Sequence, residues 1–282
     1  MKKHWFNKSI LLALALVVAL TLFAISCMPE TETAKEIGVV VTILPQADFV
    51  EKVGGEKVDV SIMVPPGASP HTYAPTPSQL AAVKQAKMYA KVGSGVEFEL
   101  VYMDRIIEAN KDMRVVDCSQ DIDLMGKDPH IWLSPRNAII MVENICSSLI
   151  QIDPENREYY TQNKNEYLIK LNELDEDIQS GLTGITNRSF MVFHPSWGYF
   201  ARDYDLTQIP IEEQGKAPTA AGITKLIEQA MANNIKVVFV SPQFDAKSAS
   251  AIAKAIDGKV TLIDPLDRAY INNMHIVLGE LT

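Results

Sequence analysis

Three of the five histidines in this chain stand in similar places, at the end of a predicted strand or in the loop before a helix. His71 follows the run VDVSIMV after a Pro/Gly turn, and His194 ends the run SFMVFH. His130 lies in the loop DPHIWLSP, before a helix expected to begin near Pro135. Asp264 ends the run KVTLID. Ligands of open α/β sheets bind outside the carboxyl ends of the strands, so these side chains would converge if two such sheets faced each other.

Three imidazole nitrogens and one carboxylate oxygen form a four-coordinate set that suits Zn²⁺. These residues are too far apart in the sequence for a zinc finger, whose ligands come in closely spaced pairs. A single histidine at a strand end is more often an ordinary hydrogen-bonded loop residue, so the pattern by itself leaves both interpretations open. Asp264 precedes Pro265 and could instead form a turn or cap a helix, with Asp267 as the alternative ligand.

The remaining polar candidates are assigned structural or surface roles. His275 has no strand end near it and is expected at the surface. Glu212 and Glu213 are expected to be solvated loop charges. Cys118 and Cys146 are too few to build a fold on disulfides, and whether they pair or remain buried free thiols is left open.

Short β-branched runs alternate with amphipathic stretches in both halves of the chain, which predicts parallel βαβ units. The predicted strands are 38–44, 58–64, 88–93, 114–119, 189–194, 206–211, 235–240 and 259–264. We expect an α/β protein of two (β/α)₄ lobes, each with a four-stranded parallel sheet. The N-terminal lobe would span 37–152 and the C-terminal lobe 184–282, which closes with a short helix at 268–279.

A long helix is predicted between the lobes, within a linking segment 153–183. After Pro154 no Gly or Pro interrupts the segment until Gly181, and apolar or aromatic residues recur at helical spacing. Asp153 is the expected N-cap, with Pro154 at the first helical position. At 1.5 Å per residue this helix would be about 42 Å long, which is enough to join both lobes as a rigid spine.

The first 27 residues, 1–27, are predicted to be a signal peptide with a lipobox. Three lysines precede an uncharged apolar run, Ile10–Ile25, which is shorter than the ~20 residues of a transmembrane helix. The run ends in FAISC, which resembles the lipobox of bacterial and archaeal lipoproteins, so Cys27 is the predicted site of lipidation. Residues 28–36 are polar and without periodicity, as expected of a flexible tether.

The charge balance argues against nucleic acid as a partner. The chain has 26 basic and 35 acidic side chains, a formal net charge of −9, and removal of the lysine-bearing leader would make it more acidic still. An acidic surface repels phosphate backbones and mildly attracts cations. The sequence also has no HExxH, GxSxG or P-loop motif, which would indicate a zinc protease, an α/β-hydrolase or a nucleotide-binding protein.

Four segments carry a resemblance to a known family. They are GASPHTYAPTPSQLAAV (67–83), DPHIWLSPRNA (128–138), FHPSWGYFARDYDL (193–206) and IDPL (263–266). These segments resemble the signature stretches of the zinc/manganese ABC-transporter substrate-binding proteins, the cluster A-I family of ZnuA-like and TroA-like proteins. The resemblance covers nearly all of the chain after the leader. It implies two (β/α)₄ lobes joined by one rigid helix, in an extracytoplasmic protein that passes a metal ion to a membrane permease.

Carried over by the same resemblance, the metal ligands fall on His71, His130 and His194, with Asp264 at the fourth position and Asp267 as the alternative. Manganese-selective relatives have a Glu where His194 stands, and a third nitrogen ligand favours Zn²⁺ over Mn²⁺, which prefers oxygen. Zinc-specific relatives often carry a His-rich loop near the second ligand, where this chain has only DIDLMGKD. Because of the third nitrogen ligand we expect Zn²⁺, with Mn²⁺ as the second choice.

A closed set of three imidazoles and one carboxylate holds an ion and leaves no position for a catalytic water, so we expect a binding protein and not an enzyme. The expected partners are the ABC permease and, through the lipid anchor, the membrane surface, and the chain is expected to be a monomer. One alternative is a lipid-anchored zinc hydrolase with Asp264 as general base. Another is an adhesin-like surface protein on the same fold.

Overall fold

A computed structural model describes residues 36–212 and 215–282. The predicted signal peptide with Cys27, the tether up to residue 35, and Glu213 lie outside the described residues, so the expectations for them remain predictions. None of the helices within the described ranges combines the length and the apolar character that a membrane crossing requires.

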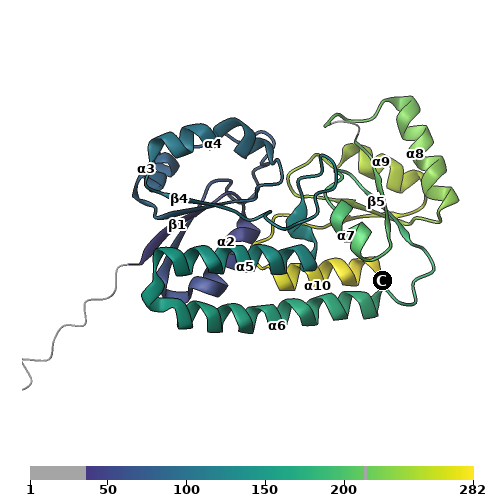
Figure 1. The fold of residues 1–282 in the computed structure, drawn as a ribbon. Coiled ribbons are helices and arrows are strands. Elements are labelled where there is room, and N and C mark those ends of the chain that lie inside the picture. The colour runs from purple at the N-terminus through teal and green to yellow at the C-terminus, as the bar shows by residue number, and fades with distance from the viewer. Residues whose placement is uncertain (1–35, 213–214) are drawn as a thin grey trace, which may run out of the picture. The chain divides into compact units, whose positions relative to one another are not determined.

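The first sheet is parallel and has helices on both faces (Figure 1). Its strands are β1 (Ile37–Val41), β2 (Val58–Ile62), β3 (Met88–Lys91) and β4 (Arg114–Asp117), in the order β2-β1-β3-β4. The helices are α2 (Leu44–Gly54), α3 (Pro77–Gln85), α4 (Glu97–Ala109) and α5 (Pro135–Ile152), with short turns η1 (Gly55–Lys57) and η2 (Ile131–Leu133). Because both faces are covered, the central strand reads as a continuous apolar run, and Val39, Val40 and Val41 are at most 1% exposed.

The second sheet repeats the topology of the first. Its strands are β5 (Ser189–Val192), β6 (Thr207–Pro210), β7 (Val237–Val240) and β8 (Lys259–Leu262), all parallel, in the order β6-β5-β7-β8. The connecting helices are α7 (Gly198–Asp203), α8 (Ala220–Ala232) and α9 (Lys247–Ala255). In both sheets the chain first moves to one edge and then crosses to the other side of its first strand. This switch opens a crevice at the carboxyl ends of the strands, where the histidines were predicted to lie.

The predicted linking helix is present, but it begins later than expected. Residues Pro154–Asn156 form a short 3₁₀ turn (η3), and the helix proper is α6 (Arg157–Gly181). The Asp153 carboxylate accepts hydrogen bonds from the Asn156 amide (2.7 Å) and the Tyr160 hydroxyl (2.6 Å), and not from a backbone N–H as an N-cap does. Asp153 thus stands at the N-cap position of the turn, with Pro154 first in it as predicted, but its side chain caps no backbone N–H.

Helix α6 connects the two lobes by packing against elements of each. Its buried face consists of Tyr160, Tyr167, Leu171, Leu174 and Ile178. These residues lie over α2 and α5 of the first lobe and over α10 (Tyr270–Leu281), the last helix of the second (Figure 1). One apolar core continues from the first sheet through α6 to α7 and α10, while a second core lies on the other face of the second sheet. A shared core of this kind opposes wide hinge motion between the lobes.

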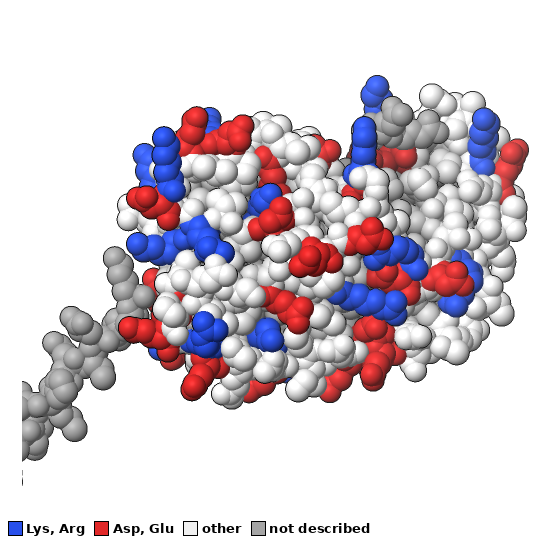
Figure 2. All heavy atoms as spheres, viewed as in Figure 1, with Lys and Arg blue, Asp and Glu red and all other residues white. Residues whose placement is uncertain are grey.

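The surface carries both signs of charge. Figure 2 shows acidic side chains distributed over both lobes with basic ones between them, and no large field of a single sign on the face in view. On this face the acidic side chains therefore do not form one continuous negative field.

Candidate metal centre

The structure brings His71, His130 and His194 together from three separate loops. His71 lies in the loop between β2 and α3, His130 directly before η2 and α5, and His194 between β5 and α7. Of the histidine, cysteine and acidic side chains in the described ranges, these three form the one group whose candidate ligand atoms all lie within 4.8 Å of one another. The predicted convergence of the three imidazoles is thus present in the fold.

The separations of the Nε2 atoms fit one small tetrahedral ion. Nε2 of His194 lies 3.2 Å from Nε2 of His71 and 3.3 Å from Nε2 of His130. Two ligands on a tetrahedral zinc, each at a Zn–N distance of about 2.05 Å, are about 3.3 Å apart. Both separations from His194 are therefore close to the spacing that zinc coordination requires, and the ligand atoms of His71 and His130 lie within 4.8 Å of each other.

A carboxylate holds the other nitrogen of each imidazole. Nδ1 lies 2.7 Å from a carboxylate oxygen in all three cases: Glu97 for His71, Asp128 for His130 and Glu212 for His194. Because an ionised carboxylate only accepts, each neutral ring must carry its proton on Nδ1 and present a lone pair at Nε2. Three lone pairs then point at one another with no proton between them. This arrangement is unfavourable without a cation and is the usual support for histidine ligands of zinc.

Glu212 corrects the prediction of a solvated loop charge. It follows β6 and is only 7% exposed, with its carboxylate on His194. The burial of this charge is explained by its partner, because a buried carboxylate is stable only when it is hydrogen-bonded or paired. The outcome for Glu213 lies outside the described residues.

Apolar walls surround the inner side of the site. The ring of Phe244 stacks on His194 at a centroid distance of 4.7 Å, and Trp132 lies 5.2 Å from His130. Burial lowers the pKa of the His130 imidazole, although the Asp128 carboxylate acts in the opposite direction. On the outer side the three histidines line a cleft of about 940 Å³, which also exposes Glu97 and Asp128. The site is thus bounded by aromatic side chains behind the ligands and opens into a cleft on the other side.

Asp264 is not one of the converging ligands, although its neighbour Pro265 lines the same small pocket as the three histidines. Its Oδ1 accepts hydrogen bonds from the Gln243 amide and from the backbone N–H of Leu266, both at 2.9 Å. In the described part of the chain, Oδ2 of Asp264 has no hydrogen-bond donor. Asp267 is farther along and accepts from the backbone N–H of Ala269 at 2.7 Å. Its carboxylate therefore stabilises the turn before α10.

The remaining histidine and the two cysteines of the described residues lie away from the metal centre. His275 is exposed on α10, 3.1 Å from the Asp177 carboxylate, as predicted for a surface residue. Cys118 and Cys146 are free and buried, and burial raises the pKa of both thiols. They act as small apolar side chains of the core.

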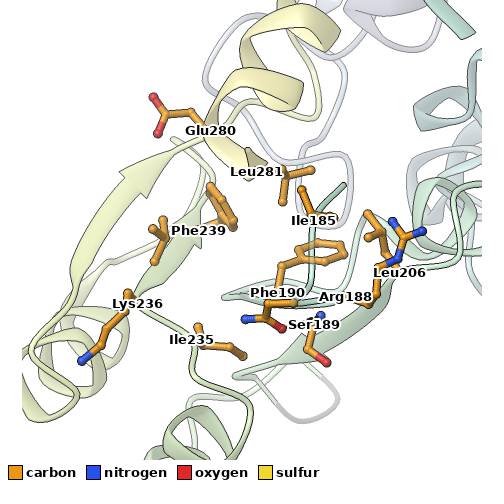
Figure 3. A pocket seen from close by; sticks show the side chains of 12 residues that line it. Ile185, Arg188, Ser189, Phe190, Leu206, Ile235, Lys236, Phe239, Glu280 and Leu281 are labelled. Carbon is orange, nitrogen blue, oxygen red and sulfur yellow. Dashed lines mark hydrogen bonds between the residues drawn. The ribbon is translucent and has the colours of Figure 1, made fainter. Parts of the chain in front are cut away.

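A separate cavity of about 120 Å³ lies at the amino-terminal edge of the second sheet. Figure 3 shows Phe190 and Phe239 on its walls, with Glu280 and Leu281 from the end of α10 nearby. Lys236 also lines it, but its amine donates to the carbonyl of Ile256 at 2.6 Å. This cavity lies at the opposite strand ends from the histidines and does not contribute to the metal centre.

Sequence reasoning did not identify the three supporting carboxylates. Asp128 had a local signal, because it stands two residues before His130 and its Oδ1 also accepts the backbone N–H of His130 at 3.0 Å. Glu97 and Glu212 had none. Each reaches its histidine from a different loop or helix, so only the folded chain reveals the pairing.

Replacement of Glu212 by Gln tests the support of His194. A neutral amide keeps the shape but lowers the basicity of the imidazole, and such changes typically reduce zinc affinity by about ten- to a hundredfold. Competitive titration with a chromophoric chelator measures the effect. Glu166→Gln, an exposed position on α6, is the matched control and should leave the affinity unchanged. If Glu212→Gln bound zinc with an affinity within twofold of wild type, the Glu212 carboxylate would not support the metal ligand His194.

Comparison with known proteins places this geometry in a family. The chain is similar to the high-affinity zinc uptake system protein ZnuA of Bacillus subtilis (strain 168), with 28% identity over 294 residues, covering 95% of this chain and 90% of that protein. It is also similar to the zinc-binding lipoprotein AdcA of Streptococcus pneumoniae (strain ATCC BAA-255 / R6), with 26% identity over 92% of this chain. The chain spans 56% of the length of AdcA.

A solved structure agrees with these sequence relatives. The crystal structure of ZnuA superposes with a TM-score of 0.85 at 40% identity, covering 88% of this chain and 98% of that one. The family model described as zinc-uptake complex component A, periplasmic, matches residues 39–282. The two lobes, the linking helix and the matched range lead to one conclusion: the chain belongs to the zinc-uptake complex component A (ZnuA) family of periplasmic proteins.

Proposed function

We propose that this protein is the extracytoplasmic substrate-binding component of a metal ABC importer, which binds one Zn²⁺ between its lobes and delivers it to the membrane permease. The observation that carries the proposal is the convergence of three Nε2 atoms, 3.2 and 3.3 Å apart, while every Nδ1 is held by a carboxylate. The relatives named for zinc uptake and zinc binding support the same cargo.

Zinc is favoured over manganese by the donor atoms. Three imidazole nitrogens suit Zn²⁺, whereas Mn²⁺ prefers carboxylate, carbonyl and water oxygens and lies at the weak end of the affinity order of divalent metals. The carboxylates of Glu97, Asp128 and Glu212 each bond to Nδ1 of a histidine, so the donor atoms that converge on the ion are the three Nε2 nitrogens. Mn²⁺ would therefore bind more weakly at this site.

The fourth ligand is proposed to be Asp264. Its Oδ1 is held by Gln243 and Leu266, which fixes the carboxylate, while Oδ2 remains available for a metal. Asp267 remains the alternative; its Oδ1 accepts the backbone N–H of Ala269 at the start of α10. Completion by Asp264 would give a closed tetrahedral site, which holds an ion and does not activate water.

The proposed role is binding and transfer without catalysis. A hydrolase would need an open coordination position and an acid/base group beside it. The names of the relatives describe zinc uptake and zinc binding, and they support neither the hydrolase nor the adhesin-like alternative. We further propose that Cys27 is lipidated and that residues 28–36 tether the folded body to the membrane, so that it stays near the permease as a monomer.

Release of the ion is proposed to require only a small movement. Helix α6 and the continuous core connect the lobes, so wide opening would expose a large apolar surface. Loss of one or two ligands when the protein docks on the permease would be enough to free the ion into the cleft.

Metal titration of the full-length chain in detergent tests the proposal. Elemental analysis is expected to find one zinc per chain, and competitive titration should show that Zn²⁺ displaces Mn²⁺ but not the reverse. Zinc uptake by cells that depend on this importer should be lost when the protein is absent. Tighter binding of Mn²⁺ than of Zn²⁺, or a stoichiometry well below one, would contradict the proposal.

A further inference from the structure

The loop that carries His130 belongs to the first half of the chain, yet it is bonded to the second lobe along its length. The hydroxyl of Tyr199, on α7, accepts the backbone N–H of Met125 at 2.8 Å and donates to the carbonyl of Asp128 at 3.3 Å. Further bonds between this loop and the second lobe are Trp132 Nε1 to the Pro265 carbonyl (2.7 Å), Arg202 Nη1 to the Asp123 carbonyl (3.4 Å) and the Ser134 hydroxyl to Asp203.

Helix α7, which makes most of these contacts, begins four residues after His194. The element that follows one ligand therefore holds the loop of another. A Cβ on Gly198, the first residue of α7, would lie 2.3 Å from Oδ2 of Asp128, so only glycine permits this close approach. The imidazoles of His130 and His194 are correspondingly enclosed, with side chains 7% and 11% exposed.

The loop of His71 is held differently. Its backbone hydrogen bonds stay within the first lobe, as when Phe98 donates to the carbonyl of Pro70 at 3.0 Å. Within the described residues, the loop 65–76 makes one contact of hydrogen-bond length with the second lobe. It joins Nε2 of His71 to Nε2 of His194. The His71 side chain is 25% exposed and its partner Glu97 is 51% exposed.

We propose that the metal centre has two parts: a preformed pair, His130 and His194, for which Tyr199 is a positioning residue, and a detachable ligand, His71. Without metal, the hydrogen bonds across the lobes hold the pair in place against the mutual repulsion of its two lone pairs. His71 joins when the ion binds and leaves first when the ion is released toward the open side of the cleft. This inference rests on the proposed zinc-binding function.

Hydrogen exchange of the full-length chain, with and without Zn²⁺, tests the two parts separately. The amides of Met125 and His130 should exchange slowly in both states. Those of Thr72 and Tyr73, which bond only to the Ser69 carbonyl of their own loop, should slow by about tenfold on zinc binding. Equal gains of protection in both loops would overturn the preformed pair.

Tyr199→Phe removes the two hydrogen bonds and keeps the ring. In the metal-free protein it should speed exchange at Met125 and His130 by about tenfold and weaken zinc binding by a similar factor. Tyr204→Phe is the matched control, since that hydroxyl donates to Asp175 at 2.6 Å and does not contact the His130 loop. Unchanged exchange at Met125 and His130 in Tyr199→Phe would overturn the role of Tyr199. If the wild-type protein bound no zinc, the proposed function would be wrong. Hydrogen exchange of the metal-free protein would still show whether the His130–His194 pair is preformed.

Discussion

Replacement of His194 by Ala is expected to weaken zinc binding by about two to three orders of magnitude. Binding energies of structural zinc are about 10–16 kcal/mol for four ligands, so one ligand contributes on the order of 3–4 kcal/mol. His194 is the central imidazole, since its Nε2 lies within 3.3 Å of both other ligand nitrogens. Competitive titration of the variant against wild type measures the loss.

The same variant should also destabilise the metal-free protein. Glu212 would keep its buried carboxylate but lose the imidazole that bonds to it, and an unsatisfied buried group costs about 1–3 kcal/mol. His275→Ala is the control, because His275 is exposed and its partners are Asp177 at the surface and the Ile271 carbonyl of its own helix. If both variants bound zinc as wild type does, the metal centre would have to lie elsewhere.

Lowering the pH from 7.5 to 5.0 is expected to weaken zinc binding by about three orders of magnitude. Only neutral imidazole coordinates zinc, and protonation of an ordinary imidazole with a pKa of about 6.5 reduces affinity by about thirtyfold at pH 5. His130 should contribute least, because burial lowers the pKa of its imidazole and keeps it neutral at lower pH. Titration calorimetry at intervals between these pH values measures the slope.

The depressed pKa of His130 also links pH to the stability of the metal-free fold. The unfolded chain binds this proton at higher pH than the folded chain does, so the contribution of His130 is present above the ordinary pKa and is lost as the pH falls below it. Circular dichroism at pH 5 is therefore needed to show that the protein remains folded during the titration. An unchanged zinc affinity between pH 7.5 and 5.0 in a folded protein would exclude the histidines as ligands.

The local pattern of the sequence predicts most of the fold. Runs such as Val39–Val41 identify buried parallel strands, and the spacing of Tyr160, Tyr167 and Leu171 identifies the inner face of α6. The start of α6 could not be placed, because Asp153 bonds to the side chains of Asn156 and Tyr160 and not to the backbone. Which of these donors bonds to the carboxylate depends on side-chain conformations, and the spacing of apolar residues in the sequence does not predict those conformations.

The sequence by itself determined that His71, His130 and His194 stand at strand ends or in loops that two facing parallel sheets bring to one crevice. The choice of these three as ligands came from the resemblance of their segments to a known family. Only the tertiary structure decided how they are held: by Glu97 and Glu212 from separate elements, and by Tyr199 across the lobes. The physical reason is range. Strand and helix patterns arise between near neighbours in the chain, whereas hydrogen bonds in the site join groups whose proximity exists only after both lobes have packed against α6.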